Sequence, residues 1–217
     1  DCLFTFNQKD KRLIREQYGR DDSRVLNLFL GLEDQILEKQ IDSKKRQYGN
    51  ICFLGQMGRP ENHTAAMRLI AIARRVKEQL PTLQVYIVGN QPSEELKRQA
   101  DDYIHVTGFV DNVDEYLERA WLAVFPLNQG AGIKMKVLRS LAMGTPVVTT
   151  MVGAEGIDED GEVIELAETD EEFADRIMAY FHDVAMMEEK AEKSRTYIKD
   201  HFSWEVSESV LEEVYGS

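Results

Sequence analysis

The sequence predicts an α/β fold, in which a doubly wound, Rossmann-like parallel sheet carries flanking helices on both faces. Short runs such as VYIV (85–88) and LAVF (122–125) are apolar throughout, which is typical of strands buried on both faces of a parallel sheet. These runs alternate with segments whose apolar residues have helical spacing. Because such sheets bind ligands at the carboxyl ends of their strands, the loops after the runs are the candidate site.

The individual elements follow from apolar runs, glycines, prolines and capping residues. We expect strands at 2–6, 25–30, 51–54, 84–88, 103–106, 121–125, 147–148 and 162–166. We expect helices at 9–18 (capped by Asn7), 34–39, 62–80 (capped by Asn62), 93–99, 113–119 (capped by Asp111 or Asn112), 170–181 (capped by Thr169 or Asp170), 184–199 and 204–214. A further helix carries Val137, Leu138, Leu141 and Ala142 on one face and ends at Gly144.

The composition limits the classes of function. A formal charge of -13, from 39 acidic and 26 basic side chains, argues against general binding of nucleic acid or anionic membranes. Cys2 and Cys52 make no disulfide framework, which predicts a reducing, cytoplasmic location. No apolar run is long enough to span a bilayer.

The strongest sign of a ligand is the loop Gly130-Ala131-Gly132, which separates an apolar run from a helix. The first amides of a helix have no partner within it, and glycines let a ligand approach the backbone closely. No Asp or Glu occurs from 119 to 154, whereas Arg119, Lys134, Lys136 and Arg139 do. We therefore expect a phosphate or diphosphate at this loop. The alternative is a tight turn followed by a surface helix fringed with lysines.

Three further glycine loops follow predicted strands, at 55–60, 89–90 and 108–110. In a parallel sheet all of them lie at the same edge as the loop at 130–132. The four histidines have no metal-ligand spacing, and no nucleophile or metalloprotease motif is present, so we expect no metal site.

The motifs ICFLGQMGRPEN, VYIVGN, HVTGFVDNVDEYL, GAGIKMKVLRSLAMGTPVVTT and VGAEGI, in this order, resemble the C-terminal nucleotide-sugar-binding domain of retaining GT-B glycosyltransferases of group 1, or family 4. The similarity covers about residues 50–182. It implies that residues 1–42 are a remnant of the acceptor domain and a linker, that 43–202 are the Rossmann-like donor-binding domain, and that 203–217 form a crossover helix.

The resemblance also implies a set of site residues. The expected catalytic residues are Lys134 and Arg59, which would offset charge on the departing diphosphate. The residues expected to bind the nucleotide sugar are Gly55, Gln56, Met57, Gly89, Asn90, Val106, Gly108, Phe109, Gly130, Ala131, Gly132, Ile133, Lys134, Val137 and Arg139.

The sequence departs from the family pattern at two of these positions. Many relatives carry two glutamates eight positions apart, the second of which contacts the ribose, and the matching residues here are Ala131 and Arg139. Arg139 replaces an acceptor-only carboxylate with a donor-only guanidinium. It could meet the ribose, a phosphate or an acidic side chain.

The resemblance implies transfer of a sugar from a UDP- or GDP-linked donor to an acceptor hydroxyl, with retention, in polysaccharide or glycoconjugate synthesis. No further cofactor is expected. The expected partners are a sugar, lipid-linked or protein acceptor and the missing acceptor domain, which would encode any membrane association. The fragment alone would be weakly active or inactive. Two alternatives stay open: a non-catalytic binding or scaffold module, motivated by Arg139, and a nucleotide-sugar epimerase.

Overall fold

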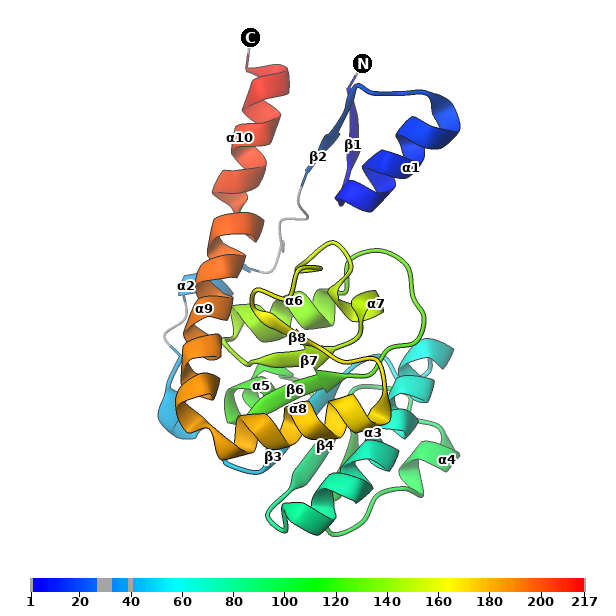
Figure 1. Cartoon of the computed structure of the whole chain (residues 1–217), viewed down its shortest axis with the longest axis vertical. Helices are drawn as coiled ribbons and strands as arrows, with labels where there is room; N and C mark the ends of the chain where they lie inside the picture. The colour runs from blue at the N-terminus through cyan, green and yellow to red at the C-terminus, as the bar shows by residue number, and fades with distance from the viewer. Residues whose placement is uncertain (1, 27–32, 39–40, 217) are drawn as a thin grey trace.

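The computed structural model describes residues 2–26, 33–38 and 41–216. Its centre is a six-stranded parallel sheet in the order β5-β4-β3-β6-β7-β8 (Figure 1). The strands are β3 (Asn50–Leu54), β4 (Gln84–Val88), β5 (Ile104–Gly108), β6 (Leu122–Phe125), β7 (Val147–Thr149) and β8 (Ile164–Leu166). The predicted doubly wound α/β fold is confirmed, and the two halves of the sheet meet where β3 pairs with β6.

Helices cover both faces of this sheet (Figure 1). On one face lie α3 (Pro60–Gln79), α4 (Glu94–Lys97) and α8 (Asp170–His182), and α3 packs against the other two. The other face carries α5 (Asp114–Arg119) and α6 (Met135–Ala142), with α9 (Val184–Phe202) packed on α6. Every residue of β3, β6 and β7 is buried, as continuous apolar strands require.

Two helices that border the glycine loops begin at other residues than expected. The prediction that Asn62 caps α3 is wrong, because the helix begins at Pro60, whose fixed φ and missing N–H suit the first helical position. Asn62 is instead buried, and its Nδ2 donates to the carbonyl of Gln56 at 3.0 Å. Similarly, Lys134 is the N-cap residue of α6 and lies outside its first turn.

Other capping predictions are confirmed. Asn7 accepts the amide of Asp10, and Thr169 forms a reciprocal capping box with Glu172. In contrast, the prediction that Asp111 or Asn112 caps α5 is wrong, because the N-cap residue is Val113, which makes no side-chain cap hydrogen bond. Asn112 Oδ1 still accepts the amide of Asp114 at 3.0 Å. The short helix α7 (Met151–Ala154) was not predicted, since four residues carry no periodic signal.

A small unit at the N-terminus has its own two-stranded sheet, separate from the six-stranded one. It contains β1 (Leu3–Thr5), α1 (Gln8–Tyr18) and β2 (Ser23–Val25), and the two strands pair in parallel. The strand predicted at 25–30 is thus found at 23–25, and residues 27–30 lie outside the described residues. The connection to the sheet domain includes α2 (Glu33–Glu38) and a short 3-10 helix at Ser43–Lys45.

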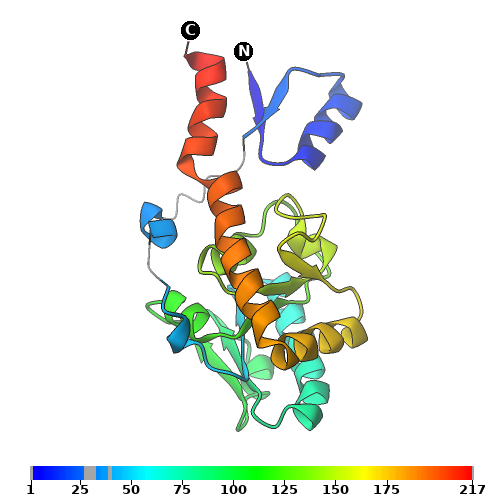
Figure 2. The same ribbon diagram turned by 60° about the vertical axis from the view of Figure 1, so that its left-hand side comes forward.

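The last helix, α10 (Trp204–Tyr215), continues from α9 and lies beside β1 and β2 (Figure 2). The rings of Phe4 and Tyr215 are 6.2 Å apart, and Arg24 lies 3.6 Å from Glu213. In the part of the chain that the structure describes, no helix has the length and apolar character needed to cross a membrane.

Candidate functional site

Two adjoining cavities lie beyond the carboxyl ends of β3, β4, β5 and β6. The chain leaves β3 and β6 towards opposite faces of the sheet, and ligands of doubly wound sheets bind at such a switch point. The loop cavity, of about 320 Å³, is lined by Gly55, Gln56, Arg59, Glu61, Asn62, Leu127, Gln129, Gly130, Ala131, Ile133, Lys134, Met135 and Lys136. The strand cavity, of about 350 Å³, is lined by Leu54, Gly55, Val88, Gly89, Asn90, Phe109, Val110, Val113, Met135, Lys136 and Arg139.

The loop cavity is bordered by the glycine loop (residues 126–134) and the start of α6. Gly130 and Gly132 have φ values of 135° and 69°, which L side chains rarely adopt. Among the described residues, no acceptor takes a hydrogen bond from the amide N–H groups of residues 130–136, and α6 has no side-chain cap. A run of unpartnered donors at a helix start is a site for an anion.

Lys134 was predicted to contact the diphosphate, and in the structure its side chain contacts its own loop. Its Nζ donates to the carbonyl of Gly130 at 3.3 Å and also to that of Gly132. Burial lowers the pKa of Lys134, and nearby Glu155 partly offsets this effect. Lys134 therefore holds the glycine loop in shape while adding positive charge to the cavity.

Lys136 is the site residue that sequence reasoning missed. Its Nζ lies 4.9 Å from the ring centre of Phe53 and 5.7 Å from that of Phe125, at the junction of β3 and β6. Its hydrogen-bond partner there is Oδ1 of Asn62. Burial lowers the pKa of Lys136 to about 8. A cation that lines both cavities and has only a neutral hydrogen-bond partner suits an anionic ligand.

The signal that could have found Lys136 is helical spacing. It precedes the fully buried Ser140 by four residues, so both lie on the inward face of α6. Arg59 completes the basic set of the loop cavity: it is exposed, and its guanidinium has no hydrogen-bond or ion-pair partner among the described residues. Against Arg59, Lys134 and Lys136, this cavity has one acidic lining residue, Glu61.

At the strand cavity the loops after β3 and β4 approach each other closely. A Cβ on Gly89, whose φ is 145°, would lie 1.7 Å from the carbonyl oxygen of Gly55. Val88, Val110 and Val113 give the cavity an apolar wall. Phe109 stands at its rim with 74% of its surface exposed. An apolar slot with an exposed aromatic ring suits a flat heteroaromatic group.

Arg139 pairs with an acidic side chain, which is one of the three roles that the sequence left open. Its Nε and Nη2 donate to the two carboxylate oxygens of Asp114 at 2.6 and 3.0 Å. The side chains are 23% and 13% exposed, so the pair is partly desolvated. The pair stands at the end of the strand cavity where α5 approaches α6, and it brings a carboxylate close to this wall.

Most of the residues predicted to bind the nucleotide sugar line one of the two cavities. Those that do not are Met57, Val106, Gly108, Gly132 and Val137. Met57 and Val137 are buried in the core, and the carbonyl of Gly108 accepts the amide of Gly89. Met57 and Val137 therefore contribute to packing, and Gly108 contributes to the backbone shape of the loops. Among residues 2–26, 33–38 and 41–216, no group of three or more His, Cys, Asp or Glu could hold a metal ion.

Comparisons with known proteins agree with this geometry. The family described as "Glycosyl transferases group 1" matches residues 49–183. An "uncharacterized 44.6 kDa protein in cps region" of Klebsiella pneumoniae is 27% identical over 176 residues, which cover 76% of this chain and 45% of that protein.

Solved structures share the fold. WaaG, a glycosyltransferase involved in lipopolysaccharide biosynthesis, superposes with a TM-score of 0.78 at 16% identity over 99% of this chain and 63% of its own. S. aureus TarM, solved with UDP among its ligands, superposes with a TM-score of 0.75 at 19% identity, over 98% of this chain and 42% of its own. HepE of Anabaena, solved with UDP and glucose, superposes with a TM-score of 0.71 at 13% identity, over 100% of this chain and 63% of its own.

The chain spans less than two thirds of the length of each of these proteins. The region that the family description matches contains the six-stranded sheet and both cavities. The chain therefore belongs to the group 1 glycosyltransferases and has the Rossmann-like half of the GT-B fold.

Proposed function

We propose that this chain is the donor-binding half of a retaining glycosyltransferase, which transfers a sugar from a nucleoside diphosphate to an acceptor hydroxyl. The observation that carries the proposal is the run of unpartnered amides at residues 130–136 beside the half-buried ammonium of Lys136. A diphosphate supplies several acceptor oxygens and the negative charge that these donors lack.

The two cavities suggest how the donor lies. The diphosphate occupies the loop cavity, where Arg59, Lys134 and Lys136 are gathered. The nucleoside extends into the strand cavity, whose apolar wall and exposed Phe109 suit a base. Because Lys136 lines both cavities, it would lie where the diphosphate joins the nucleoside.

The chemistry follows from this placement. As the bond from the sugar to the diphosphate breaks, negative charge grows on the diphosphate oxygens. Fixed amides and the ammonium of Lys136 lie ready to stabilise that charge without reorganisation. We propose that a second domain binds the acceptor, so we expect turnover to require that domain. We propose polysaccharide or glycoconjugate synthesis as the context and the cytoplasm as the location.

Calorimetric titration with UDP, GDP and ADP tests the donor-binding role. We expect UDP or GDP to bind at micromolar to millimolar concentration, and UDP is tried first because the solved structures of TarM and HepE contain it. Phe109→Ala should weaken this binding by about tenfold, in keeping with ~1–3 kcal/mol for stacking of a base on a ring. Its thermal unfolding should not change, since the ring is exposed. Absence of binding at millimolar nucleotide would favour a non-catalytic scaffold module.

The pair of Arg139 and Asp114 gives a second prediction. Arg139→Met should lower the free energy of unfolding by about 1–3 kcal/mol, because it leaves a partly buried carboxylate unpaired. It should also weaken nucleotide binding, since Arg139 lines the strand cavity. In the double variant Arg139→Met, Asp114→Leu, urea unfolding should recover most of the lost stability. If the single variant is as stable as the wild type, the pair contributes nothing to the fold.

A further inference from the structure

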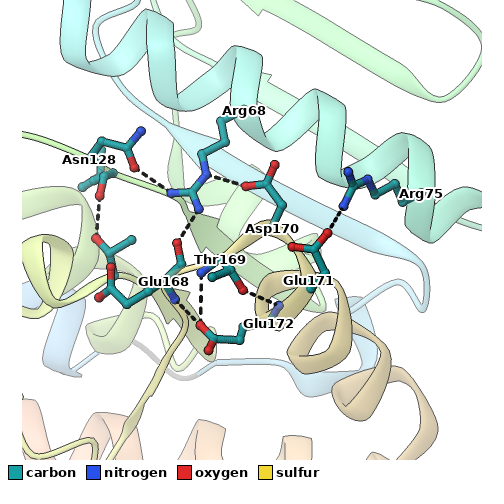
Figure 3. Close-up of polar contacts among 10 residues, drawn as sticks. Arg68, Arg75, Asn128, Glu168, Thr169, Asp170, Glu171 and Glu172 are labelled. Carbon is teal, nitrogen blue, oxygen red and sulfur yellow. Dashed lines mark hydrogen bonds and ion pairs between the residues drawn. The ribbon is translucent and has the colours of Figure 1, made fainter.

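Arg68, in the middle of α3, joins three segments that are distant in sequence (Figure 3). Its Nε donates to Asp170 Oδ1 at 2.7 Å, and its Nη2 donates to the carbonyl of Glu168 at 2.6 Å, both at the start of α8. Its Nη1 donates to Asn128 Oδ1 at 2.7 Å. Each guanidinium nitrogen thus has an acceptor, and the group also lies 5.2 Å from the ring centre of Phe173.

Asn128 links this junction to the candidate site. It lies two residues before Gly130, in the glycine loop whose following residues line the loop cavity. The side chain of Asn128 makes this one hydrogen bond within the described part of the chain. Upstream, the loop is held by the bond from the Thr150 hydroxyl to the carbonyl of Leu127. Downstream, it is held by the hydrogen bonds of Lys134 and by the packing of Ile133 against the core.

A loop that binds an anion through its own amides has to be ordered before the ligand arrives, or the ligand's binding energy is reduced by the cost of ordering it. Residues 128–133 make no backbone-to-backbone hydrogen bonds among the described residues, so the loop depends on side chains for its hydrogen-bonded support. The contact with Arg68 holds the loop at Asn128, three residues beyond the end of β6. Arg68 is itself anchored by its bonds to Asp170 and to the carbonyl of Glu168.

We propose that Arg68 is a positioning residue for donor binding, which acts through Asn128 to hold the glycine loop in its binding shape. The inference rests on the proposed function, and it concerns residues that do not line either cavity. A purely structural role, in which Arg68 only fastens α3 to α8, makes a different prediction. In that case removal of the Asn128 side chain would not change nucleotide affinity.

The chain offers a matched control in Arg75. It lies on the same helix seven residues later, and its Nη1 pairs with Glu171 at 2.7 Å, again in the first turn of α8 (Figure 3). Arg75 therefore fastens α3 to α8 without any contact to the glycine loop. Asn128 is exposed, so Asn128→Ala is expected to fold normally.

The experiment is calorimetric titration of UDP and GDP into the full chain and its variants, with urea unfolding of each. We expect Asn128→Ala and Arg68→Lys each to weaken binding by about three- to tenfold, the range set by one lost hydrogen bond. The unfolding midpoint of Asn128→Ala should not change. Arg75→Ala should bind within about twofold of the wild type, since it breaks only an exposed pair. The double variant Arg68→Lys, Asn128→Ala should bind no more weakly than Arg68→Lys alone, because both changes remove the same contact between Arg68 and Asn128.

If the wild type binds nucleotide and Asn128→Ala binds it with the same affinity, this inference is overturned and the proposed function is left intact. Equal losses of affinity in Arg68→Lys and Arg75→Ala would also overturn it, because they would point to the packing of α3 on α8 alone. A wild-type chain that binds neither nucleotide would overturn the proposed function, and the inference with it.

Discussion

Lys136→Met is expected to weaken binding of a nucleoside diphosphate by about 10- to 100-fold, which corresponds to the ~1.5–3 kcal/mol of a hydrogen bond to a charged group. Methionine keeps the apolar stem against Phe53 and Phe125 and removes only the ammonium. The measurement is calorimetric titration of UDP and GDP near pH 7, where the pKa of about 8 leaves most of Lys136 protonated.

Lys134→Met is the matched control, two positions earlier in the same segment. Lys134 donates to the carbonyls of Gly130 and Gly132, so its loss should loosen the loop and reduce affinity by a smaller factor. If Lys134→Met were the more damaging change, Lys134 would be the phosphate ligand, as the sequence first indicated. Equal, unchanged affinity in both variants would remove both lysines from the site.

The lowered pKa of Lys136 also predicts how stability depends on pH. Folding lowers this pKa from 10.5 to about 8, so the folded state disfavours the proton that the unfolded state keeps. The resulting decrease in the free energy of unfolding is fully present below pH 8 and is lost as the pH rises from 8 to 10.5. It amounts to about 3 kcal/mol at most, by the conversion of ~1.36 kcal/mol for each pKa unit.

In Lys136→Met this contribution to the rise in stability between pH 8 and 10.5 should be absent, as urea unfolding of the unliganded proteins at both pH values would show. The variant should also be the more stable of the two at pH 7. Conversely, a bound diphosphate should raise the pKa of Lys136 and make affinity fall above pH 8. A wild-type affinity that stays constant from pH 7 to 10 would contradict this.

Gly89→Ala is expected to be the most damaging change of a single small residue at the site. The added Cβ would lie 1.7 Å from the carbonyl oxygen of Gly55, at a φ of 145° that alanine rarely adopts. Overpacking and backbone strain together should lower the free energy of unfolding by about 3–5 kcal/mol. The loops after β3 and β4 would also have to separate, so nucleotide affinity should fall by more than about tenfold.

Gly108→Ala provides the control, because Gly108 ends the neighbouring strand β5. Its φ is 70°, but a Cβ there has no atom within 4 Å, so only the strain of about 1–2 kcal/mol applies. Urea unfolding of the two variants side by side checks the difference. Similar losses in both would show that conformation, and not close approach of the two loops, determines the effect of Gly89→Ala.

Much of the fold was readable from the sequence because its signals are local. Continuous apolar runs place β3, β4 and β6, and the cap at Thr169 places α8. The loops of the site could be predicted too, since topology alone brings the carboxyl ends of parallel strands together. The exceptions were elements with no periodic signal, such as the four residues of α7.

The roles of side chains at the site were harder to predict, because each depends on where a helix begins and on a distant partner. A start at Met135 turns Lys136 inward over Phe53, while Lys134 folds back on its loop. The sequence shows that Arg139 replaces a carboxylate. It does not show that Arg139 pairs with Asp114, 25 residues earlier, whose carboxylate is thereby held beside the site.

The small N-terminal unit is followed in the chain by the segment that contains α2, and α10, which lies beyond the passage from α9, contacts its strands. Ser203 makes that passage with an extended backbone between the two helices. The ion pair between Lys9 and Glu155, at 3.0 Å, and the packing of Asn7 on Gly156 add a direct contact between the unit and the loop that follows α7. Any displacement of the unit from the sheet domain therefore has to break these contacts.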